Sequence, residues 1–190
     1  MKTKKNAGVV FTALFAALIS VAYFFRVPLP GLVPIVLQDT LALLSGMLLG
    51  PVYGGAAVAV YLLLGIIGLP VFSGNSGLHV ITKGYTGGFL IGYLLGAITA
   101  GLILHLFLNP SKEHGKIKQW IVIISASLLA TVVLFTCGIF EFMRIAHCGI
   151  DKAFAACLIP FIPGNLIKQT INVILTKNLR PVIKNYLYEA

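Results

Sequence analysis

Residues 160–168 read Pro160-Phe161-Ile162-Pro163-Gly164-Asn165-Leu166-Ile167-Lys168 and stand near the start of the last long apolar segment of the chain. Proline is accepted in the first turn of a helix, so Pro163 predicts a helix start that places Asn165 and Lys168 one turn apart on the same side. Polar residues continue along that face, as Gln169, Asn172 and Thr176. Such a stripe has to face protein, water or a ligand, because lipid cannot satisfy it. We therefore interpret Lys168 as the floor of a pocket; the alternative is a side chain that snorkels to the membrane surface.

The composition places the chain among integral membrane proteins. Of its 190 residues, 58% are hydrophobic and only 10% are charged, whereas soluble domains carry about 25% charged residues. The net charge of +9 does not indicate nucleic acid, because the Lys and Arg residues gather in short connections between apolar segments. The cysteines, Cys137, Cys148 and Cys157, lack the close pairs of a metal or redox motif and are interpreted as small apolar residues.

The apolar segments predict an all-α protein with six transmembrane helices in a single membrane domain, residues 1–190. The predicted helices cover residues 8–25, 35–50, 51–68, 87–108, 119–147 and 163–188. Gly50-Pro51 is a tight-turn signal and makes the second and third helices a hairpin. Residues 151–158 read as a short interfacial helix. The glycine-dotted connection 69–86 is long and still apolar, so we expect it to fold over the bundle as a cover.

Six spans put both termini on one side of the membrane, and most of the Lys and Arg residues fall on that side. By the positive-inside rule both termini are predicted to be cytoplasmic. The Pro-rich loop 26–34, the connection 69–86 and the stretch around Lys168 then share the outer face.

Small residues recur at a spacing of four on two predicted helices. Ala13 and Ala17 would give the first helix a smooth patch, either for a partner helix or for ordinary packing within this chain. On the fourth helix the series is Gly84, Gly88, Gly92, Gly96 and Ala100. This series predicts close helix packing, with a sliding surface as the alternative.

The motifs of common catalytic sites are absent from the sequence. There is no G-x-x-x-x-G-K-[ST] phosphate loop, so the chain cannot hydrolyse ATP by that route. The histidines, His79, His105, His114 and His147, lack metal-ligand spacing. An acid–base pair would have to be built from Asp39 and Glu141, yet Asp39 fits the positive end of a helix dipole and Glu141 fits a pair with Arg144. We predict no catalytic residue, no metal and no cofactor.

The pocket chemistry that remains is one fixed cation, several amides and hydroxyls, and apolar walls. Such a site suits a small, partly apolar molecule that carries a carboxylate and hydrogen-bonding atoms. Gln38 either lines this pocket or bonds another helix.

Five motifs occur in order along most of the chain: Pro34-Ile-Val-Leu-Gln38, Leu48-Leu-Gly-Pro51, Tyr61-Leu-Leu-Leu-Gly-Ile-Ile-Gly-Leu-Pro-Val-Phe72, Gly84-Tyr-Thr-Gly-Gly88 and Pro160-Phe-Ile-Pro-Gly-Asn-Leu-Ile-Lys168. With them the chain resembles the BioY family, the biotin-specific substrate-binding (S) components of energy-coupling factor transporters. The resemblance implies an S-component-type helix bundle in the cell membrane of a prokaryote, which binds biotin near its outer face for uptake. It also implies, as partners, a transmembrane coupling protein and two cytoplasmic ATPase subunits, with no role for nucleic acid.

The resemblance also assigns residues. It implies that biotin contacts Gln38, Asn165, Lys168 and the loop at Asn75 and Ser76, which stand as alternatives because the loop alignment shifts by one residue. Tyr85 is a further predicted binding residue. The family usually has Asp at position 165 and Pro at position 85, so affinity or ligand preference is expected to differ.

Two questions stay open at this point, the group of the ligand that Lys168 contacts and the choice between rival functions. Lys168 either pairs with the carboxylate of biotin or donates to its ureido carbonyl. Ala13 and Ala17 match the family's contact with the coupling protein. The rival functions are an S component for another vitamin, a stand-alone secondary carrier, and a small intramembrane enzyme that uses Asp39 and Glu141.

Overall fold

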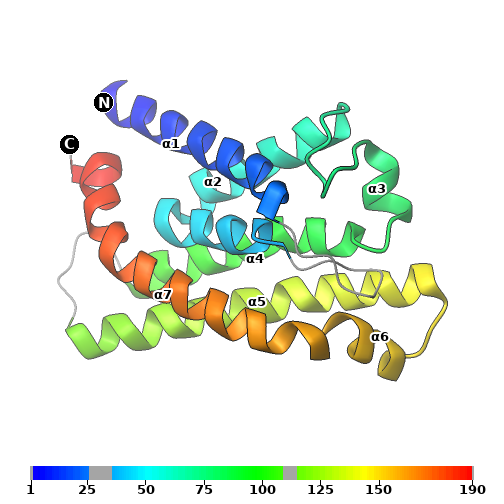
Figure 1. Cartoon of the computed structure of the whole chain (residues 1–190). Coiled ribbons are helices and arrows are strands. Elements are labelled where there is room, and N and C mark those ends of the chain that lie inside the picture. Colours follow the sequence, from blue (N-terminus) through cyan, green and yellow to red (C-terminus); the bar gives the residue numbers. More distant parts are fainter. Residues whose placement is uncertain (1, 26–35, 109–114, 190) are drawn as a thin grey trace.

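A computed structural model of the chain describes residues 2–25, 36–108 and 115–189 (Figure 1). The predicted Pro-rich loop at 26–34, the start of the predicted helix at residue 35 and most of the polar connection after residue 108 lie outside these residues.

Helices make up nearly all of the described chain, in agreement with the predicted all-α class. The α-helices are α1 (Lys2–Val21), α2 (Gln38–Ile66), α3 (Leu78–Lys83), α4 (Gly87–Phe107), α5 (Lys116–Ala146), α6 (Ile150–Cys157) and α7 (Ile162–Lys184). Short helical turns complete them, η1 (Ala22–Phe25), η2 (Ile159–Phe161) and η3 (Asn185–Glu189). Within the described ranges, β-structure is limited to an isolated bridge between Phe72 and Asn75.

Within the part of the chain that the structure describes, five helices are long and apolar enough to cross a membrane. Large apolar side chains on their outer faces are exposed, such as Val132 at 60%, Phe140 at 72% and Ile121 at 59%. Exposed apolar surface of this extent would be unfavourable in water and is what a lipid-facing helix presents. The fold is therefore that of a multi-pass membrane protein.

The helix α2 is a hairpin, as the Gly50-Pro51 turn predicts. Gly50 has a φ of 82° and a ψ of −179°, a conformation that glycine adopts readily and other residues do not. Beyond it the chain runs back along itself, because the hydroxyl of Ser45 donates to the Gly54 carbonyl at 3.2 Å and the Gln38 side chain reaches the Tyr61 hydroxyl. The arms correspond to the predicted helices at 35–50 and 51–68. Whether each arm crosses the membrane, which a total of six spans requires, stays a prediction.

The core lies where α4 packs between α2 and α5. A Cβ added at Gly88 would collide with the backbone carbonyl of Cys137 on α5, so this glycine allows the two helices to approach closely. Close helix packing, the first of the two interpretations of the small-residue series, is therefore confirmed at Gly88.

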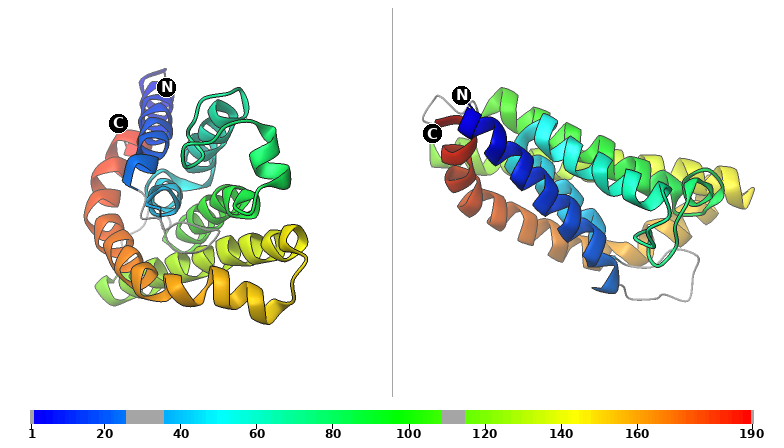
Figure 2. Two further views of the ribbon diagram at one scale, coloured as in Figure 1. Left: turned by 45° about the vertical axis from the view of Figure 1, so that its right-hand side comes forward. Right: turned by 90° about the horizontal axis from the view of Figure 1, so that it is seen from above.

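The two termini lie at one end of the bundle, and α3 and α6 lie at the other (Figures 1 and 2). At the terminal end, the rings of Phe11 and Tyr186 pack edge to face with centroids 6.4 Å apart. Termini at one end are what an even number of crossings requires; their cytoplasmic side stays a prediction.

Candidate ligand-binding site

A cavity lies between α2, α4, α5, α7 and the segment that follows α2. It contains about 520 Å³ of space, counted with the solvent at its open side. Its lining combines aromatic and aliphatic walls with a small polar region: Val36, Gln38, Asp39, Phe72, Ser73, Thr86, Phe89, Leu90, Tyr93, Leu134, Phe135, Phe161 and Lys168. Apolar walls with a few placed polar groups are the usual composition of a small-molecule site.

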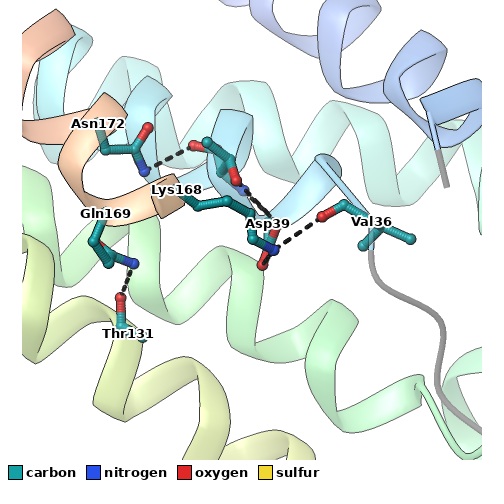
Figure 3. A network of polar contacts seen from close by, with 7 residues as sticks. Val36, Asp39, Thr131, Lys168, Gln169 and Asn172 are labelled. Carbon is teal, nitrogen blue, oxygen red and sulfur yellow. Dashed lines mark hydrogen bonds and ion pairs between the residues drawn. The ribbon is translucent and has the colours of Figure 1, made fainter. Parts of the chain in front are cut away.

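Lys168 is one of the two charged residues that line the cavity, together with Asp39. Its residue is only 7% exposed, so the alternative in which it snorkels to the membrane surface is wrong. The ammonium donates to the Asp39 carboxylate (Nζ to Oδ2, 2.5 Å) and to the carbonyl of Val36 (3.0 Å). Figure 3 shows the lysine reaching from α7 to the first turn of α2. The other oxygen of Asp39 accepts from the backbone N–H of Thr40 at 2.7 Å and from its hydroxyl at 3.2 Å.

Gln38 lies beside this pair and holds three parts of the chain together. Its residue is 1% exposed, and its amide nitrogen contacts the carbonyls of Ile19 (3.1 Å) and Val71 (2.8 Å) and the hydroxyl of Tyr61 (3.1 Å). Both interpretations of Gln38 therefore hold, since it lines the cavity and bonds other elements. Because buried amides need partners, this contact set fixes the ends of α1 and α2 against the covering segment.

The polar stripe of α7 continues beyond the ion pair and faces protein. Asn172 donates to the carbonyl of Thr40 at 3.3 Å. Gln169 points instead to α5, where its amide donates to the hydroxyl of Thr131 (Figure 3). Its amide oxygen also accepts from the hydroxyl of Ser127. This stripe thus fastens α7 to both α2 and α5.

The segment after α2 covers the cavity, as its apolar character predicts. Ser73 (φ 52°) and Gly74 (φ 89°) make it turn sharply, while Phe72 and Val80 are buried. The short helix α3 within it was not predicted. Arg144 at the end of α5 donates to the carbonyl of Thr82 on α3 at 2.8 Å, and so holds this cover to the bundle.

The structure brings some of the predicted binding residues to the cavity and not others. Gln38 and Lys168 line it, whereas Asn75, Ser76, Tyr85 and Asn165 are not part of its lining. Asn75 is exposed and forms its bridge with Phe72. Tyr85 is 37% exposed, and its ring lies 5.7 Å from that of Phe142. Asn165 is partly exposed in the first turns of α7.

Three polar residues of the lining were not assigned from the sequence, namely Asp39, Ser73 and Thr86. An acidic residue in an apolar segment needs a cation, but the sequence alone does not say that Lys168 is the cation beside Asp39. Asp39 and Glu141 are held in separate ion pairs, with Lys168 and Arg144 respectively. This arrangement gives no support to an enzyme that uses the two carboxylates together.

Comparisons with known proteins point to one family. The sequence profile described as the BioY family matches residues 1–185. The "Biotin transporter BioY" of Rhizobium etli is 37% identical over 87% of this chain and 89% of its own length. That of Thermotoga maritima is 34% identical over 88% and 92%. Among solved structures, the S-component for biotin from an ECF-type ABC transporter superposes with a TM-score of 0.84 at 27% identity, covering 95% of this chain and 94% of that one.

Proposed function

The chain belongs to the BioY family, and from this membership we propose that it is the biotin-specific S component of an energy-coupling factor transporter. It is a multi-pass membrane protein that binds biotin for uptake and needs no cofactor of its own. The observation that carries the proposal is the cavity beside the buried Lys168, found in a chain whose fold matches a biotin S component.

The cavity suits the chemistry of biotin. Biotin has a compact fused ring with an apolar thioether side and a ureido side, followed by an aliphatic chain that ends in a carboxylate. Phe72, Phe89 and Phe135 provide an aromatic surface for the apolar part. The polar groups of Lys168 and Asp39 provide the donors and acceptors that fix orientation.

The proposal is tested by titrating the purified, detergent-solubilised chain with radiolabelled biotin. We expect saturable binding that unlabelled biotin displaces and that thiamine and riboflavin do not. Displacement by another vitamin in preference to biotin would assign the chain to that vitamin, and absence of saturable binding would refute the proposal.

The energy for transport comes from partners in this proposal, and the chain itself acts as a binding subunit rather than an enzyme. Its sequence lacks the phosphate loop that ATP hydrolysis uses, so a transmembrane coupling protein and two cytoplasmic ATPases supply that step. Ala13 and Ala17 are exposed on α1, which leaves their small side chains available for close contact with the coupling protein. Biotin uptake that persists in cells without any coupling subunit would favour the stand-alone carrier instead.

A further inference from the structure

The cavity contains a balanced pair of charges. Among the described residues that line it, the charged ones are Lys168 and Asp39, and they contact each other. Their side chains are only 9% and 14% exposed. The ammonium at the floor is therefore already neutralised before any ligand arrives.

Counted over the described residues, each member of the pair keeps one hydrogen-bonding position. An ammonium has three N–H groups, and Lys168 directs two of them to Asp39 and Val36 among the described residues. A carboxylate has about four acceptor positions, and Asp39 uses two on one oxygen for Thr40 and one on the other for Lys168. The pair thus offers a donor and an acceptor side by side.

A ligand carboxylate is a poor match for this pair. To reach Lys168 it would have to displace Asp39 or share the ammonium with it, which leaves two carboxylates against one cation in a buried site. A buried charge without a counter-ion is strongly unfavourable. A neutral group that accepts from the lysine and donates to the aspartate meets no such cost.

We propose that Asp39 is a ligand-contacting, specificity-determining residue, and that the Asp39–Lys168 pair stays closed and binds the ureido head of the ligand. This inference rests on the proposed function. The carbonyl oxygen and an N–H of a cyclic urea are bonded to the same carbon. One edge of the ring can therefore accept from Lys168 and donate to the Asp39 oxygen at the same time. The carboxylate tail then extends away from the pair.

The variant Asp39→Asn separates this arrangement from its alternative. If the ureido head contacts Asp39, losing the charged acceptor weakens biotin binding by at least about tenfold, as for a hydrogen bond to a charged group. If the biotin carboxylate instead binds Lys168, removing its competitor strengthens binding. Asp151→Asn is the matched control, because Asp151 is exposed at the start of α6 and outside the cavity. Unchanged or tighter biotin binding by Asp39→Asn overturns the inference.

Two ligand probes test on the wild-type chain whether the pair binds the ureido head. These experiments do not depend on whether the Asp39→Asn variant folds. Biotin amide, which has no tail charge, is expected to bind within about threefold of biotin. Biotin methylated on a ureido nitrogen is expected to bind at least about tenfold more weakly. If biotin amide binds more than about tenfold more weakly than biotin, the inference is overturned. The proposed function still stands in that case, because the chain binds biotin. A wild-type chain that does not bind biotin at all refutes the proposed function.

Discussion

Replacing Lys168 with Met is expected to destabilise the folded chain, and a second substitution at Asp39 is expected to recover most of the loss. Methionine keeps an unbranched apolar stem of similar reach but removes the ammonium. The Asp39 carboxylate, with a side chain 14% exposed, then stays in the cavity without its cation.

The expected size of the effect comes from the contacts of Lys168. Removing one partner of a buried ion pair costs about 3–5 kcal/mol, and we expect the lower end because Asp39 keeps its two contacts with Thr40. Loss of the donor to the Val36 carbonyl adds about 1 kcal/mol. The free energy of unfolding should therefore fall by about 4 kcal/mol in Lys168→Met. In the double variant Lys168→Met/Asp39→Asn it should fall by only about 1–2 kcal/mol, because no unpaired charge is left.

The assay is denaturant unfolding of the purified chain in detergent, followed by circular dichroism. Both variants are measured without ligand, so that loss of biotin binding does not enter the comparison. Equal destabilisation of the single and double variants would refute the reasoning, since it would mean that leaving the Asp39 carboxylate without Lys168 costs no free energy.

Three further predictions concern other parts of the chain. Arg144→Ala removes the donor to the α3 backbone, so biotin should dissociate about fivefold faster in a pulse–chase experiment; an unchanged rate would show that other contacts hold the cover. Ala13→Leu with Ala17→Leu adds bulk to the exposed face of α1, so uptake in cells with the coupling module should fall at least about tenfold, with biotin binding by the purified chain unchanged. Wild-type uptake would contradict that role. Thr176→Val removes a buried hydroxyl that has no hydrogen-bond partner among the described residues, so the free energy of unfolding should stay the same or rise by about 1 kcal/mol; a clear decrease would mean that the hydroxyl has a partner.

Some of the fold and site can be predicted from the sequence because the signals are local. Gly50-Pro51 predicts the hairpin of α2, since a glycine with positive φ and a proline both interrupt a helix. Lys168 in an apolar helix predicts a buried polar contact, because lipid offers an ammonium no partner.

The partner of that lysine could not be predicted from the same signals. Asp39 is 129 positions away in the sequence, and helix periodicity says which face of a helix is polar but not which helix packs against it. Asp39 alone fits a helix dipole equally well. Choosing between these roles needs the relative placement of α2 and α7, which only tertiary packing determines.

The sequence predicts that the segment after α2 is a cover, but the path of its backbone escaped prediction for a different reason. Its turns depend on residues with positive φ, among them Ser73, which is a non-glycine residue in that conformation. Residue propensities do not predict a turn in which a serine has positive φ. As a result, Ser73 lines the cavity while the neighbouring Asn75 and Ser76, the predicted contacts, do not.

The central claim is that this chain holds biotin in the cavity against Lys168. The most direct measurement is mass spectrometry of the small molecule released by the chain after gentle purification from cells grown with biotin, with Lys168→Met purified in parallel. We expect biotin from the wild-type chain and none above background from the variant. A different vitamin from the wild-type chain, or equal amounts of biotin from both proteins, would contradict the account.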